Sequence, residues 1–193
     1  MTSFTRRELG AVAALALGGS LAGCFGDDAD DDPANGADDT PEEPPDGYEE
    51  PVALWWADST PDIDAAFELL ESGDTAVDDG ELEEAMDDYE DAFRAFQDLV
   101  RAVNAEIEET DPEEVPAALI DLWMLVGDYF FVYVDVAITR YDAVYETVVE
   151  EDPEGGAAYR EESDDHIADA AVIADELESI IGDYDGVSIR QLA

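Results

Sequence analysis

The feature that most constrains the fold of this chain is an apolar stripe that runs without interruption through residues 81–109. Its members are separated alternately by four and three residues: Leu82, Met86, Tyr89, Phe93, Phe96, Val100, Val103 and Ile107. This spacing places all of them on one side of an α-helix that packs nearly parallel to its neighbours. Such a helix buries its stripe against other helices, so the stripe predicts an all-α domain.

Three further segments carry the same periodicity, at residues 62–77, 114–150 and 157–181. The stripe of the third segment consists of Leu119, Trp123, Val126, Phe130, Tyr133, Ala137, Arg140, Val144 and Val148. The stripe of the last consists of Ile167, Ala170, Ala174, Leu177 and Ile181. Short breaks rich in Asp, Gly and Pro separate the segments, and the first helix is expected to begin after Ser59-Thr60-Pro61. We therefore predict an antiparallel four-helix bundle-like domain over residues 51–193.

The charge of the chain excludes whole classes of partner and site. It contains 54 Asp and Glu residues, seven Arg and no Lys, for a net charge of −47. Nucleic acid is excluded as a natural partner, because phosphate recognition requires Lys and Arg. With one Cys and one His, His166, the chain has neither a disulfide framework nor the ligands of a Cys- and His-rich zinc site or a di-metal bundle. We expect no metal and no cofactor.

The first 23 residues have the layout of an export signal. Arg6 and Arg7 precede an uncharged run that is short for crossing a bilayer and ends in small residues. The Arg pair resembles the signals of the twin-arginine translocation route, and the end of the run resembles a lipobox: Leu21, Ala22, Gly23 and Cys24. The resemblance implies cleavage before Cys24 and a lipid on its sulfur, which would anchor the protein to the extracellular face of the cell membrane.

Residues 24–50 are expected to be a tether. The segment 25–50 contains twelve acidic residues, several prolines and no basic residue. Such a composition predicts a disordered linker that repels itself and extends. Together with the Arg-only, acid-rich composition and the export signal, this chain resembles exported lipoproteins of halophilic archaea.

Residues 66–99 also resemble a single tetratricopeptide repeat. The matching positions are Leu69, Gly73, Gly80, Ala85, Tyr89 and Ala92. The match lacks the large aromatic residue of the first helix and the closing proline, where Gln97 stands. One repeat-like helical hairpin within a bundle is what the resemblance implies, since a solenoid needs about three repeats.

The third helix is apolar on the flanks of its stripe as well, at Met124, Leu125, Phe131, Val132 and Ile138. Such a helix has to be covered nearly all round, by residues 51–56 with Trp55 and Trp56, by the C-terminal residues 186–193, or by a partner protein or second copy. The first hypothesis is therefore a non-catalytic protein-interaction or scaffold module. The alternative is a lipoprotein that binds a small molecule or ion among aromatic residues of the bundle: Phe93, Phe96, Trp123, Phe130, Tyr133 and Tyr145.

No feature of the sequence indicates an enzyme. The chain has no nucleophile-elbow serine and no phosphate-binding loop, and its many carboxylates single out no pair.

The charge generates a first prediction. Repulsion between the carboxylates is largely screened at molar salt, where the Debye length is about 3 Å. We expect the domain to unfold or lose compactness below about 1 M KCl, because screening then weakens. Circular dichroism across a KCl titration measures this, and spectra that do not change between low and molar KCl would contradict the halophilic interpretation.

Overall fold

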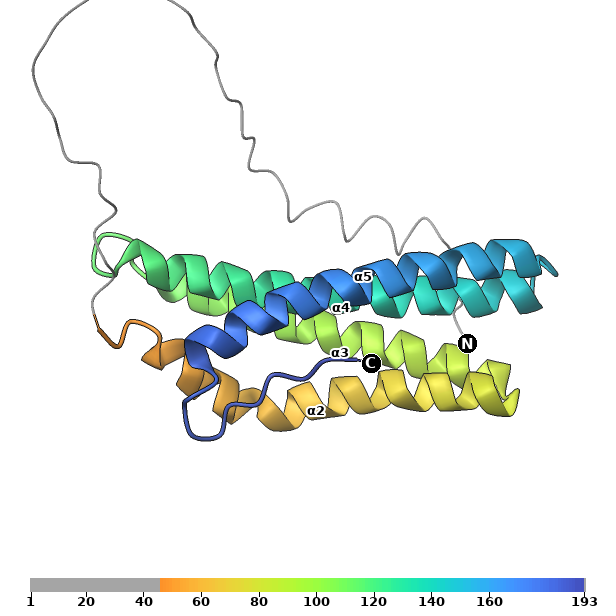
Figure 1. The fold of residues 1–193 in the computed structure, drawn as a ribbon, viewed down its shortest axis with the longest axis horizontal. Coiled ribbons are helices and arrows are strands. Elements are labelled where there is room, and N and C mark those ends of the chain that lie inside the picture. Colours follow the sequence, from red (N-terminus) through yellow and green to blue (C-terminus); the bar gives the residue numbers. More distant parts are fainter. Residues whose placement is uncertain (1–45, 193) are drawn as a thin grey trace, which may run out of the picture. The chain divides into compact units, whose positions relative to one another are not determined.

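A computed structural model describes residues 46–192, and these form an all-α domain. Its helices are α2 (Glu50–Asp79), α3 (Leu82–Glu109), α4 (Ala117–Val148) and α5 (Pro153–Ile181), with no strand among the described residues. Consecutive helices run antiparallel (Figure 1), which confirms the predicted fold class. The signal residues, Cys24 and nearly all of the expected tether lie outside the described residues.

The helices are not packed symmetrically. α4 packs along both α3 and α5, and α2 packs along α3, but α2 and α5 scarcely touch each other. The C-terminal tail, residues 182–192, runs back between α2 and α5 (Figure 1). The tail therefore closes the side of the bundle that the helices leave open.

α4 is the central element of the core. Its buried residues include a run of aromatic side chains, Trp123, Tyr129, Phe130 and Tyr133. By length and composition alone α4 could also cross a membrane, with a mean hydropathy of 1.6 in its most apolar window, but a core helix passes the same test. The segment 129–139, whose composition also suits a strand, is helical because the stripe runs through it.

The expected start of the first helix is wrong. α2 begins at Glu50, twelve residues before the predicted start, and Pro61 lies inside it. An interior proline costs a helix about 3 kcal/mol. The turns before Pro61 bury Val52 and Trp56 completely, and Thr60 Oγ1 donates a hydrogen bond to the carbonyl of Trp56 at 3.0 Å. Burial against α4 thus outweighs the local signal to stop.

α5 also begins earlier than expected, at Pro153 rather than Ala157. The Asp152 carboxylate caps the helix by accepting hydrogen bonds from the backbone N–H groups of Glu154 and Gly155, and a proline in the first turn loses no helical hydrogen bond. Gly156 then lets α5 approach α4 closely. A Cβ at this position would lie 2.7 Å from the carbonyl oxygen of Ala143.

α2 and α3 are joined by a tight turn and approach each other closely at a glycine. Gly80 follows α2 with φ of 78°, a left-handed conformation that glycine adopts without strain. The ring of Tyr89 lies against Gly73, where a Cβ would come within 2.5 Å of its Cε1 atom. The hairpin therefore depends on glycine at both positions.

Candidate functional site

The residues predicted to form a partner surface do not form one continuous exposed face. Trp56 is fully buried and belongs to the core, whereas Met124 is 54% exposed. The other five are half-buried: Trp55, Leu125, Phe131, Val132 and Ile138. Trp55 packs edge-to-face on Trp123 with ring centroids 5.6 Å apart. The first turns of α2 and the C-terminal tail both cover α4, as two of the expected alternatives proposed.

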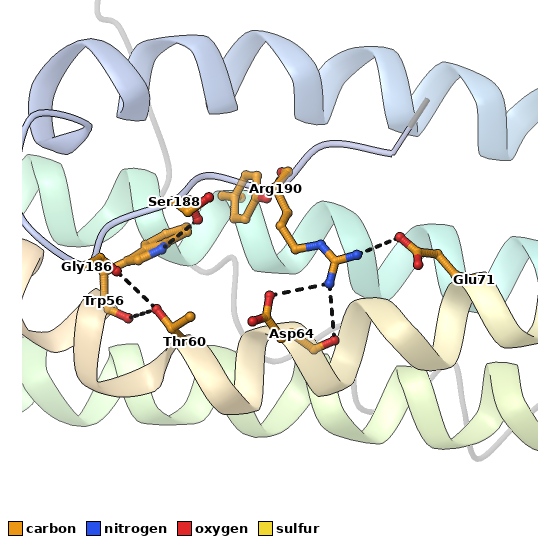
Figure 2. A network of polar contacts seen from close by, with 8 residues as sticks. Trp56, Thr60, Asp64, Glu71, Gly186, Ser188 and Arg190 are labelled. Carbon is orange, nitrogen blue, oxygen red and sulfur yellow. Dashed lines mark hydrogen bonds and ion pairs between the residues drawn. The ribbon is translucent and has the colours of Figure 1, made fainter.

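The tail is held through its backbone. Three alternate carbonyl groups of the tail accept hydrogen bonds from side chains of α2 and α4, and Figure 2 shows the two from α2. The donor–acceptor pairs are Thr60–Gly186 (3.5 Å), Trp56–Ser188 (3.2 Å) and Tyr129–Arg190. Burial raises the pKa of the Tyr129 hydroxyl, so this group keeps the proton that it donates.

The side chain of Arg190 ties the tail to α2. Its guanidinium contacts Asp64 Oδ1 at 3.3 Å and Glu71 Oε1 at 2.6 Å (Figure 2). It also lies 5.1 Å from the ring centroid of Phe67, close enough for a cation–π interaction. Arg190 thereby joins residues more than 110 positions apart in the sequence.

A cavity of about 260 Å³, the polar cavity, is lined by residues of all four helices. Its first residue on α2 is Asp74, one helical turn after Glu71, which is the last residue of α2 that Arg190 of the tail contacts. Its polar lining consists of Asp74, Asp78, Arg140, Arg160, Ser163 and Asp164. Val77, Ala143, Val144 and Tyr89 complete the lining. The polar cavity is thus the part of the open side that the tail does not fill.

One wall of the polar cavity is a bridge across three helices. The Tyr89 hydroxyl of α3 donates to Asp74 Oδ1 of α2 at 2.7 Å, and Arg140 of α4 donates to Asp74 Oδ2. The Arg140 side chain is only 14% exposed. Burial, and secondly the hydrogen bond to Asp74, raise the pKa of Tyr89, so its hydroxyl stays neutral. The charges of Asp74 and Arg140 balance each other, and the wall is fixed in place.

The α5 side of the polar cavity is different, because the exposed Arg160 forms no ion pair and the buried Ser163 hydroxyl forms no hydrogen bond with the described residues. Arg94, Arg101, Arg140 and Arg190 each form an ion pair, whereas Arg160 pairs with none of the described residues. Ser163 is 2% exposed. Its Oγ is one of three buried side-chain oxygens in the described part of the chain that lack a hydrogen-bond partner. A buried hydroxyl left unpaired costs about 1–3 kcal/mol, so this feature calls for an explanation.

Sequence reasoning did not identify this site, although a signal for it exists. Continuing the α5 stripe toward the N-terminus with the same spacing leads from Ile167 to Ser163, Arg160 and Gly156. Small and polar residues thus occupy positions where the rest of the stripe is apolar. Ser163 and Arg160 line the polar cavity, whereas Gly156 lies in close contact with α4. Arg140, which also lines the cavity, holds a comparable position in the stripe of α4.

The aromatic residues proposed for a ligand are placed elsewhere. None of the six lines the polar cavity. Four of them are buried, Phe96, Trp123, Phe130 and Tyr133, and Phe96 stacks on Tyr133 with centroids 5.3 Å apart. Phe93 and Tyr145 are half-buried.

The polar cavity is suited to binding through charge and hydrogen bonds. Ser163 has no hydrogen-bonded base that could activate it as a nucleophile. Among residues 46–192, no group of three or more His, Cys, Asp or Glu side chains is arranged to hold a metal ion. His166 lies on the same helix as Ser163 and interacts electrostatically with Asp135 of α4.

Comparison with protein-family models, with curated proteins and with solved structures finds no match to this chain.

The contacts of Arg190 predict its contribution to stability. Replacing Arg190 by Gln removes its ion pairs and the cation–π contact, and should lower the free energy of unfolding by about 1 kcal/mol. The matched control is Arg101→Gln, because Arg101 is 68% exposed and pairs only with Asp98 on the same helix. Thermal unfolding in molar KCl compares the two variants, and equal unfolding temperatures would show that the tail is not held by Arg190.

Proposed function

We propose that this protein is a lipid-anchored binding protein that displays a non-catalytic helical domain on the outer face of the cell membrane. In this proposal the domain binds a small molecule in the polar cavity. The anchor and the export route are proposed from the twin-arginine and lipobox-like residues that end at Cys24. The acidic linker would hold the domain away from the lipid surface.

The observation that carries the binding role is the unpaired polar side of the polar cavity. Arg160 has no ion-pair partner among the described residues, and the Ser163 hydroxyl beside it in the stripe is buried without a partner. Leaving the buried Ser163 hydroxyl unpaired costs free energy, and a ligand that hydrogen-bonds to it offsets that cost, whereas the Arg160 guanidinium is exposed and available to a ligand. A concave site with a few convergent polar groups and an apolar remainder is the usual form of a small-molecule site.

A protein-interaction module is the second candidate. Its specific support is the 54% exposure of Met124 on α4, the helix whose outer face was expected to be apolar. Two chains of such high negative charge would associate most easily through an uncharged patch. The candidate partner is therefore a second copy of the chain, and a monomer found by light scattering in molar KCl would count against it.

The ligand-binding role is tested by filling the polar cavity. Ser163→Leu places an apolar side chain at the buried position, whereas Ser179→Leu makes the same change at an exposed position of α5. We expect the wild type and Ser179→Leu, purified from their own membranes in molar KCl, to release a small molecule on denaturation that Ser163→Leu lacks. Mass spectrometry of the released fraction measures it, and identical small-molecule contents in all three preparations would refute the role.

The membrane anchor is tested separately at Cys24. Replacing Cys24 by Ser removes the only sulfur that could carry the lipid, so the protein should leave the membrane or accumulate as an uncleaved precursor. Membrane fractionation and the mass of the N-terminal peptide distinguish these outcomes. A normally cleaved protein that stays on the membrane would contradict the lipid assignment.

A further inference from the structure

We infer that the ligand of the polar cavity is a small zwitterion, an α-amino acid with a short aliphatic side chain. The inference rests on the proposed binding function and specifies its ligand. Arg160 and Ser163 would hold the carboxylate, Asp78 and Asp164 would receive the ammonium group, and the apolar residues of the lining would contact the side chain.

The charges that line the polar cavity favour a zwitterion over an ion of either sign. Asp74 and Arg140 neutralise each other. The remaining charged groups of the lining are Asp78, Asp164 and Arg160, and neither aspartate pairs with an arginine of the described residues. A simple anion would gain Arg160 but meet two carboxylates, whereas a simple cation would leave Arg160 unpaired. All three groups are exposed, and a ligand that carries both charges can pair with each of them without meeting a like charge alone.

The positions of Arg160 and Ser163 suit a carboxylate. The two residues are three apart in α5, so their side chains lie on the same face of the helix. A guanidinium can donate two hydrogen bonds to one carboxylate, and the serine hydroxyl can donate a third. The bound carboxylate would thus satisfy the buried Ser163 Oγ, which has no partner in the domain itself.

Size and polarity limit the rest of the ligand. At about 260 Å³, the polar cavity is below the range of roughly 300–1,000 Å³ that is typical of sites for drug-sized molecules. The aliphatic part of its lining consists of Val77, Ala143 and Val144. These residues offer a contact surface for a branched hydrocarbon side chain but no partner for a further polar group.

Three matched compounds test the inference. L-Valine carries both charges, 3-methylbutanoate is the same molecule without the amino group, and 2-methylpropylamine is the same molecule without the carboxylate. Isothermal titration calorimetry of the full chain in about 2 M KCl, where long-range repulsion is screened, should detect binding of L-valine. Each analogue should bind at least about tenfold more weakly, which is the effect of losing a hydrogen-bonded charge.

Two variants identify the groups involved. Arg160→Gln should lower the affinity for L-valine about tenfold or more. The affinity for 2-methylpropylamine should not change, because the amine has no carboxylate to pair with Arg160. The control is Arg101→Gln, because Arg101 is exposed and does not line the polar cavity. This variant should bind L-valine with the affinity of the wild type. Ser163→Ala should weaken L-valine by a smaller factor, since it removes one neutral donor.

The outcomes separate this inference from the proposed function. If 2-methylpropylamine or 3-methylbutanoate binds as tightly as L-valine, the inference that the ligand is a zwitterion is wrong, although the polar cavity still binds a small molecule. If none of the three binds while Ser163→Leu still lacks a small molecule that the wild type carries, the ligand class is wrong and the binding role stands. If L-valine binds equally well to Arg160→Gln, its site is not the polar cavity.

Discussion

The domain is built around the burial of α4. This helix is apolar on most of its circumference, so a single neighbouring helix cannot cover it. α3 and α5 pack along two sides of α4, and the rings of Trp55 and Trp56 cover part of the rest. The tail adds to this cover, and Tyr129 of α4 donates a hydrogen bond to the carbonyl of Arg190. The early start of α2 and the ordered path of the tail both follow from the need to remove water from α4.

The extreme charge decides how the elements can be joined. With 54 acidic residues and seven arginines, polar contacts between distant segments depend on a few cations. Arg140 joins α4 to α2, and Arg190 joins the tail to α2. Arg94 and Arg101 instead pair within α3, three or four residues away, where exposed pairs contribute little. Arg160 has neither role in the described structure, which is why the proposed binding site is placed beside it.

The polar cavity lies where the stripe of α5 stops being apolar although the helix still faces the core. The stripe of α5 changes from Ile167 to Ser163 and Arg160, so α5 contributes no large apolar side chain to the core there. Nearby, Gly156 brings α5 close to α4, and no residue of the tail lines the polar cavity. Local violations of core patterning are expected at functional sites. The same groups that fail to fill the core are those proposed to hold a ligand.

The stripe periodicity alone determined that the domain is all-α, that it has four long helices, and nearly where α3 and α4 begin and end, because a four-and-three spacing suits no other regular structure. Arg140, Arg160 and Ser163 could also be identified as polar members of the stripes, but the sequence did not show how they are arranged. Tertiary structure alone decided that α2 continues through Pro61, that the tail lies along α4, and that Asp74 meets Arg140. Each depends on contacts between segments far apart in the chain, whose free energy outweighs the local preferences that a sequence displays.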